Sequence, residues 1–146
     1  MADGVSHLIE VRDRPAFLRR VMLELAGHAQ MSVEGDLSQC HFSQDVIVTT
    51  DETAILKRNT TAPRQDFLVL RLTSETCGPI SRQAGKYLKR AIIHVQIERD
   101  SVLELGAYDH FHRECVVTGP GISPALLAEL KSTNVLRDFE VAKRWG

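Results

Sequence analysis

The sequence lacks most of the features that reveal a function directly. It has three cysteines, Cys40, Cys77 and Cys115, and no CxxC pair. An odd number of widely spaced cysteines, in a chain large enough to fold around its own core, indicates free thiols rather than a disulfide framework. The chain also has no P-loop, GxGxxG fingerprint, GxSxG elbow or HExxH zinc motif. No reaction class follows from a motif.

An excess of charge of one sign and long apolar runs are missing too. The chain holds 18 basic and 19 acidic residues, which argues against a nucleic-acid binder because such proteins need a cationic surface. Aromatic residues make up only 5% of the chain, so base stacking on single strands is not expected. No apolar run approaches the roughly 20 residues that span a bilayer, and the N-terminus does not resemble a secretory signal. We expect a cytoplasmic protein without a membrane role or a cofactor.

The residues that are present indicate an ordinary globular domain. With 146 residues and 43% hydrophobic content, we expect a single compact domain over 1–146, with residues 1–5 flexible. Amphipathic helices are predicted at about 14–26, from near 80 to 91, and at 123–133. Asp13 and Ser123 are the expected N-caps of the first and third helices, and a proline follows each within the first turn.

Strand patterns fill much of the remaining sequence. They occur at 7–11, at 31–42, twice within 45–59 around a turn at 50–52, at 65–73, twice within 94–108 and at 113–119. Five of the seven residues in 67–73 are apolar, which predicts a central strand buried on both faces. The tail from 134 is expected to form an edge strand or a docked coil.

This order of elements predicts the fold class. Runs of neighbouring strands are separated by three helices, and strict βαβ alternation is absent. We therefore predict an α+β fold with a single mostly antiparallel sheet and about three helices packed on it. A doubly wound nucleotide-binding fold fits this order poorly.

The segment YDHFHREC, residues 108–115, is the densest cluster of potential metal ligands. In a strand, His110 and His112 would share one face with Tyr108, and Cys115 would need a bulge to join them. His41 could supply a further ligand from another strand. A metal site on His110, His112, Cys115 and His41 is one reading; His110 and His112 as acid–base groups, or as solvated surface, are the others.

Cys77 is the best candidate for a nucleophilic thiol. It precedes Gly78-Pro79 and the predicted second helix, whose N-terminus could lower the thiol pKa. Buried packing is the alternative for all three cysteines, because free cysteine is among the most buried residue types.

Basic side chains gather on two of the predicted helices. The second helix carries Arg82, Lys86, Lys89 and Arg90, and the first carries Arg14, Arg19 and Arg20. Placed side by side, these residues would form a patch for a phosphate group or an acidic protein. A cationic helix face that is merely solvated is the alternative.

Taken together, these patterns favour binding over catalysis. We expect a small non-catalytic protein-binding, regulatory or accessory domain, which acts on a protein partner or by self-association. The alternative is a metal- or Cys/His-dependent hydrolase that uses the His110 and His112 region. A third reading is nucleic-acid or anion binding through the basic helices.

Overall fold

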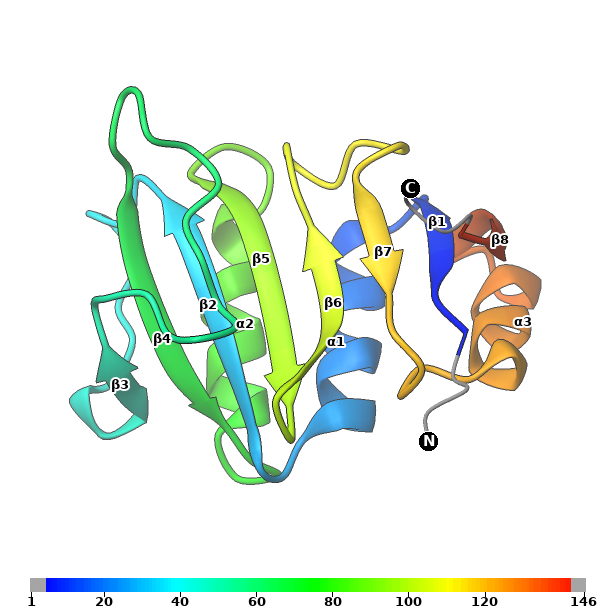
Figure 1. The fold of residues 1–146 in the computed structure, drawn as a ribbon, viewed down its shortest axis with the longest axis horizontal. Helices are drawn as coiled ribbons and strands as arrows, with labels where there is room; N and C mark the ends of the chain where they lie inside the picture. The colour runs from blue at the N-terminus through cyan, green and yellow to red at the C-terminus, as the bar shows by residue number, and fades with distance from the viewer. Residues whose placement is uncertain (1–4, 143–146) are drawn as a thin grey trace.

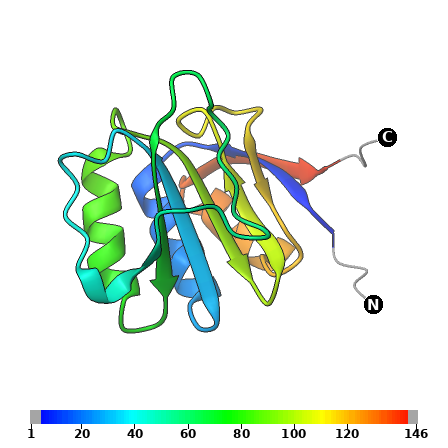
Figure 2. The same cartoon turned by 60° about the vertical axis from the view of Figure 1, so that its left-hand side comes forward.

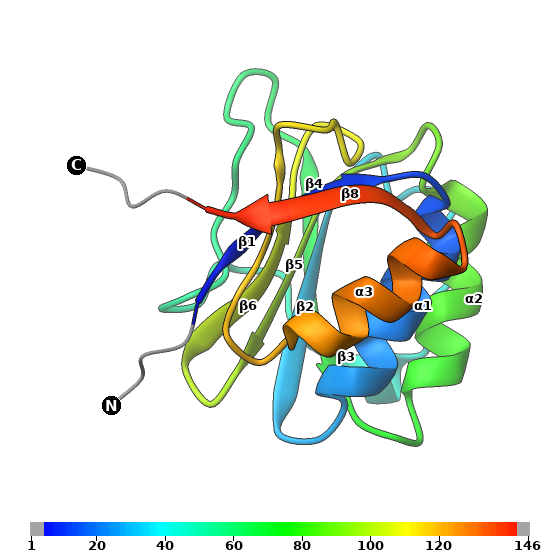
Figure 3. The ribbon, with the colours of Figure 1, turned by 90° about the vertical axis from the view of Figure 1, so that its right-hand side faces the viewer.

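A computed structural model describes residues 5–142. Within this range, eight antiparallel strands form one sheet with three α-helices on one of its faces (Figures 1 and 3). The predicted α+β class with a mostly antiparallel sheet is therefore confirmed. Residues 1–4 and 143–146 lie outside the described range. The flexibility predicted for residues 1–5 therefore concerns chiefly residues that the structure does not describe.

The strands and helices have the following bounds. The strands are β1 His7–Val11, β2 Ala29–Gly35, β3 Ile47–Thr49, β4 Asp66–Leu72, β5 Ile92–Arg99, β6 Val102–Ala107, β7 Val116–Thr118 and β8 Leu136–Val141. The helices are α1 Arg14–Leu25, α2 Cys77–Tyr87 and α3 Pro124–Ser132, with a short 3-10 turn η1 at Gln44–Val46. The strand order across the sheet is β3-β4-β2-β5-β6-β7-β1-β8. No helix in the described range is long and apolar enough to cross a membrane.

The helix boundaries follow from the capping residues. Asp13 accepts a hydrogen bond from the Ala16 N–H at 3.1 Å, and the Ser123 hydroxyl accepts one from the Leu126 N–H at 3.1 Å. Both predicted N-caps are confirmed. The second helix begins earlier than predicted, at Cys77, because Pro79 falls in the first turn, where its missing N–H costs no hydrogen bond.

Strand alternation divides the sheet into an inner and an outer face. In β2, Met31 and Val33 point toward the helices and are fully buried in the main core. Ser32 and Glu34 point to the outer face. α1 and α2 lie side by side over the inner face (Figure 2), so the helices leave the outer face to be covered by something else.

The outer face is crossed by an irregular segment, residues 50–65, which we call the strap (Figure 1). Only the first of the two strands predicted within 45–59 forms, as β3; the second prediction is wrong. Leu56 was expected in that strand and instead packs on Phe67 and Val69 of β4. β4 is thus buried on both faces, as predicted, although it lies second from the sheet edge rather than at the centre.

The C-terminal half of the sheet agrees with its sequence pattern. β5 and β6 form the expected hairpin, and the turn residues Asp100 and Ser101 have positive φ values of 52° and 65°. The tail forms β8, an edge strand paired with β1. The prediction of an edge strand is therefore confirmed for the described part of the tail.

Candidate functional site

Residues 108–115 form a loop between β6 and β7 rather than the predicted strand. Asp109, His110 and Phe111 have φ values of 53°, 58° and 61°, and three successive left-handed residues end strand alternation. Phe111 is 3% exposed and meets Phe17 of α1 edge-on, with ring centroids 6.4 Å apart. Burial of this ring turns the chain inward, so the prediction that His110 and His112 share a strand face with Tyr108 is wrong.

The four potential metal ligands are not brought together. His112 is exposed, whereas His110 and Cys115 are half-buried. His41 lies beside α2, where its N–H donates to the Gln83 side chain at 2.9 Å. Within residues 5–142, no group of three or more histidine, cysteine, aspartate or glutamate residues is placed to hold a metal ion.

Cys77 lies in an environment that disfavours a thiolate. It is the first residue of α2, but its side chain is 1% exposed and packs in the core. Burial raises the pKa of the Cys77 thiol, so the expected lowering by the helix N-terminus is wrong. Burial also raises the pKa of Cys40 and Cys115, with further contributions from neighbouring carboxylates. All three thiols are poorly suited to act as nucleophiles.

A buried polar cluster on the outer face was not predicted. Glu34 of β2 is opposite His94 of β5, and Ser32 of β2 is opposite Gln96 of β5. All four side chains are buried, and the exposed fraction of Glu34 is only 1%. The sequence signal available for this cluster was the alternation of polar and apolar residues in SVE, residues 32–34, and HVQI, residues 94–97. That pattern usually means a solvated strand face, and only the strap turns it into a buried one.

The strap is bound to this cluster by hydrogen bonds. The N–H groups of Asn59 and Thr60 donate to the two carboxylate oxygens of Glu34 at 2.8 and 3.1 Å. The Thr60 hydroxyl lies 2.7 Å from Nε2 of His94. The Lys57 N–H donates to Oε1 of Gln96 at 3.1 Å. These contacts satisfy polar groups on both the strap and the sheet.

The hydrogen bonds of His94 determine which of its ring nitrogens carries the proton. The Asp109 N–H donates to Nδ1 of His94 at 3.0 Å, so this nitrogen must carry a lone pair. The neutral ring therefore has its proton on Nε2 and donates it to the Thr60 hydroxyl. A base acting on Thr60 would need the opposite tautomer. Burial lowers the pKa of His94, against the opposing charges of Glu34 and Asp109, which also favours the neutral ring.

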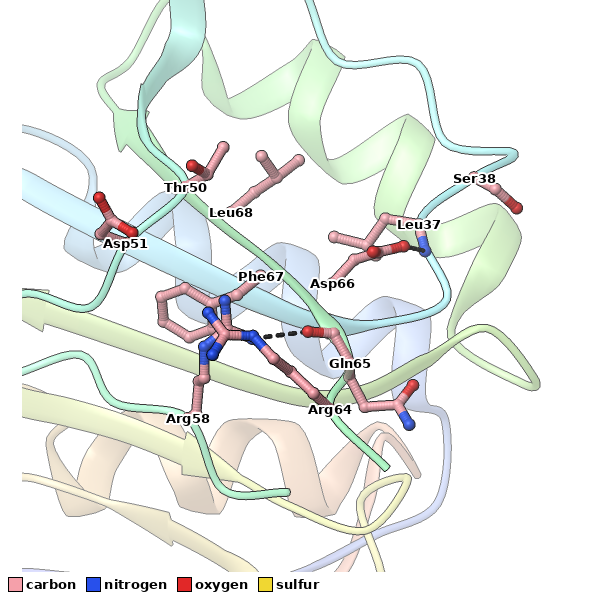
Figure 4. A pocket seen from close by; sticks show the side chains of 10 residues that line it. All are labelled: Leu37, Ser38, Thr50, Asp51, Arg58, Arg64, Gln65, Asp66, Phe67 and Leu68. Carbon is pink, nitrogen blue, oxygen red and sulfur yellow. Dashed lines mark hydrogen bonds between the residues drawn. The ribbon is translucent and has the colours of Figure 1, made fainter. Parts of the chain in front are cut away.

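A cavity of about 550 Å³ lies between the strap and β4 (Figure 4). Arg58 and Arg64 contribute two cations to its lining, and Asp51 and Asp66 contribute two carboxylates. The Arg58 guanidinium is 5.0 Å from the centroid of the Phe67 ring, and Asp66 accepts the Leu37 N–H at 3.0 Å. The cavity therefore has balanced charge and does not select an anion or a cation by charge alone.

A second cavity, of about 640 Å³, lies between the start of α1 and the end of α2 and has a strongly basic lining. We call it the basic pocket; it is lined by Arg12, Asp13, Arg14, Pro15, Gly85, Lys86, Leu88, Lys89 and Asn134. The three ion pairs in the described part of the chain involve none of its four cations. The single carboxylate, on Asp13, already accepts the Ala16 N–H. The four cations outnumber this one carboxylate, so the lining of the basic pocket has a net positive charge.

Three residues of the predicted basic patch lie together in the structure. Arg14 of the first helix meets Lys86 and Lys89 at the basic pocket, although Lys89 follows the end of α2. Arg82 lines another cavity, of about 300 Å³, with His41, and Lys86 contributes to the lining of both this cavity and the basic pocket. The other three basic residues, Arg19, Arg20 and Arg90, line none of these cavities.

Arg20 and Arg12 show why only part of this pocket could be predicted from the sequence. Arg20 of α1 forms ion pairs with Glu24 of the same helix at 3.4 Å and with Glu129 of α3 at 3.8 Å, and these pairs offset its charge. Arg12 precedes α1 and carried no helical periodicity that could assign it to the pocket. Its backbone N–H donates to Val135 O, which is distant in sequence, and this contact sets the position of the segment.

No protein-family model, curated protein or solved structure matches this chain. Its function must therefore be inferred from the geometry of its own residues.

Proposed function

We propose that this protein is a non-catalytic cytoplasmic binding domain whose basic pocket receives an anionic group, a phosphate or carboxylate, from a protein partner. The observation that carries the proposal is the convergence of Arg12, Arg14, Lys86 and Lys89 around one concavity whose lining holds a single carboxylate, that of Asp13. None of the four cations is in an ion pair within the described residues. Charge-assisted hydrogen bonds from such cations to an anion are roughly twice as strong as neutral ones.

The side chains, rather than the N-terminus of α1, supply the recognition. Asp13 caps that helix and accepts the Ala16 N–H, and Pro15 has no N–H to offer. An incoming anion would therefore contact guanidinium and ammonium groups. Because the cations are largely at the surface, binding should weaken as salt increases.

The state of the candidate catalytic groups supports a role without chemistry. Burial raises the pKa of Cys77, and the His94 tautomer donates its proton to Thr60 instead of removing one. His110 and His112 belong to a loop that is held by the buried ring of Phe111. The environments of Cys77 and His94 do not activate a nucleophile or a general base.

A protein partner is favoured over self-association through the exposed edge of β8. The Ala142 N–H donates to Ser6 O, so the backbone groups of Phe139 and Val141 point away from β1. Two copies of β8 paired about Phe139 would place Asp138 of one opposite Glu140 of the other. If the two strands instead paired about Asp138 or about Glu140, that acidic residue would lie opposite its own copy. Like charges in directly opposed positions destabilise strand pairing.

The test is titration with a neutral-sequence phosphoserine peptide and with its unphosphorylated form, followed by calorimetry and amide NMR. We expect the phosphopeptide alone to shift amides around the basic pocket. The double variant Arg14→Gln/Lys89→Gln should weaken binding by about tenfold or more, since loss of ~1.4 kcal/mol is tenfold in affinity. The matched control Arg113→Gln/Arg137→Gln removes the same charge from exposed positions outside the pocket.

Equal weakening by the two double variants would mean that the peptide responds only to net charge, and the proposal would be wrong. Binding of duplex DNA with an affinity that exceeds that of the phosphopeptide would favour the nucleic-acid reading instead.

A further inference from the structure

The cavity of about 300 Å³ that Arg82 and His41 line borders α2, as the basic pocket does. We call it the side cavity. Residues 41–46 form one of its walls and residues 79–86 of α2 form the other, on the flank of that helix that faces away from α1 (Figure 2). Two cavities with different linings therefore border the same helix.

The side cavity combines an apolar lining with positive charge. Val46 and Ile80, which are 7% and 1% exposed, contribute to this lining, and Phe42 packs half-buried against the main core. Arg82 and Lys86 add two cations, and no aspartate or glutamate of the described residues lines the cavity. The side cavity therefore suits an apolar side chain whose neighbours in sequence are neutral or acidic.

The wall opposite α2 is fixed by hydrogen bonds to regular elements. The His41 N–H donates to the Gln83 side chain of α2 at 2.9 Å, and the Arg71 guanidinium of β4 donates to Asp45 O at 2.6 Å. A cavity whose walls are already ordered costs less to fill than one that must first be formed. Its volume is at the lower limit of ligand pockets, which suits one side chain better than a whole small molecule.

Lys86 links the two cavities, because it belongs to the lining of both. Arg82 and Lys86 are four residues apart on α2, so they project from one face of the helix, and Lys89 follows after the helix ends. None of the three is in an ion pair within the described residues. A segment that enters both cavities must pass these cations, which favour negative charge on that segment.

We propose that the side cavity receives an apolar side chain from the same protein segment whose anionic group enters the basic pocket. This inference rests on the proposed function of the basic pocket and adds the second half of its ligand. The ligand is an extended segment of the partner, with an apolar residue at a fixed distance from its phosphate or carboxylate. The positive charge of both linings and the shared Lys86 support one continuous ligand.

The positions of the two cavities on the helix set the spacing in the ligand. The α2 residues of the side cavity centre on Arg82, and residues 85–89 of the basic pocket centre on Tyr87. This offset is about 7–8 Å along the helix axis, and the two sets are about 100° apart around it, which is ~10 Å at the outer radius. The cavities are thus ~12 Å apart, a distance that roughly three to four residues of an extended chain span.

The apolar lining favours a polypeptide over a nucleic acid. A peptide can present an aliphatic side chain and an anionic group a few residues apart, whereas a nucleic acid presents a phosphate at every step and no aliphatic side chain. Phe42 supplies the only phenyl ring among the described residues that line the side cavity, and it packs against the main core. Stacking of successive bases therefore has no platform here.

The experiment uses the full chain and neutral peptides that each carry one phosphoserine and one leucine. The leucine stands one to six residues before or after the phosphoserine, and a matched set has alanine in its place. Calorimetry measures the affinities, and amide NMR locates the contacts. The best leucine peptide should have a spacing of about three or four and bind about tenfold more tightly than its alanine match, since ~1.4 kcal/mol is tenfold and burial of a leucine supplies that much. Only the leucine peptide should shift amides of residues 41–46.

Phe42→Ala removes part of the apolar wall without removing a cation. It should abolish the advantage of leucine over alanine and leave the affinity for the alanine peptide unchanged. Val48→Ala is the control, because Val48 is 40% exposed on β3 and lines neither cavity. The comparison of the two peptides needs no change in the protein, so it tests the inference even where Phe42→Ala lowers stability.

Equal affinities for the leucine and alanine peptides at every spacing, with phosphoserine still required, would overturn the inference and leave the basic pocket as proposed. An advantage of leucine that persists in Phe42→Ala would also overturn it, because the leucine would then bind elsewhere. If binding does not require phosphoserine, the proposed function of the basic pocket is wrong, and the inference that rests on it is wrong as well.

Discussion

Removal of the apolar anchor of the strap should detach this segment without unfolding the domain. Leu56→Ala deletes most of a side chain that is 0% exposed and contacts Phe67 and Val69. A buried Leu→Ala change typically costs 2–5 kcal/mol, with the larger values where a cavity persists. Because the strap can move, we expect the lower part of this range, about 2–3 kcal/mol.

This cost should appear mainly as local opening. Four hydrogen bonds between the strap and Glu34, His94 and Gln96 remain in the variant, each with a net value of about 0.5–1.5 kcal/mol, or more when a charge takes part. They limit the opening but do not fill the space left by Leu56. Protection of strap amides should therefore fall by roughly 30- to 150-fold, since 1.4 kcal/mol is a factor of ten.

Hydrogen exchange with mass spectrometry, together with urea unfolding, provides the assay. The strap peptide should exchange fast in Leu56→Ala, while peptides from β2, β5 and α1 keep their protection. Leu23→Ala is the matched control, because Leu23 is 55% exposed on α1 and should change neither region by much. If Leu56→Ala lowers protection of the strap and of β5 equally, the strap is part of the main cooperative unit and the argument for a separate anchor is wrong.

Three further predictions concern the loop, the first helix and a cysteine. Phe111→Ala should lower the free energy of unfolding by about 3–5 kcal/mol, measured in urea, because a buried ring that contacts Phe17 is lost; a change below 1 kcal/mol would contradict its role as anchor. Asp13→Ala should cost about 0.5–2 kcal/mol through the lost N-cap, whereas Asp13→Asn should cost far less. Cys77 should react with a thiol reagent only at the rate of unfolding, because it is buried and its pKa is raised; fast labelling of Cys77 in the native protein would refute this.

Local sequence patterns predicted those helices and strands whose hydrogen-bond partners lie within a short segment of the chain. The first and third helices were recognisable because Asp13 and Ser123 cap N–H groups only three residues away. The β5–β6 hairpin was recognisable because its turn lies between two patterned strands. Each of these signals depends on neighbours along the chain, which are known once the sequence is known.

The polar outer face could not be predicted in the same way. Glu34 and His94 resemble residues of a solvated strand, and they are buried only because residues 56–60 return across them. Leu56 likewise looked like part of a short strand. Its partners, Phe67 and Val69, follow it in the sequence but reach it only when the strap folds over β4.

The sequence by itself determined the class of fold, the caps of two helices and the burial of β4 on both faces, because each depends on spacing and on local hydrogen bonds. Only the tertiary structure decided which polar residues became buried and which basic residues met. Asp109–Phe111 left the strand geometry because the Phe111 ring packs on α1, and Arg12 joined Lys86 and Lys89 because α1 and α2 are neighbours. Contacts between distant segments depend on how the layers pack, and no periodicity within a segment encodes them.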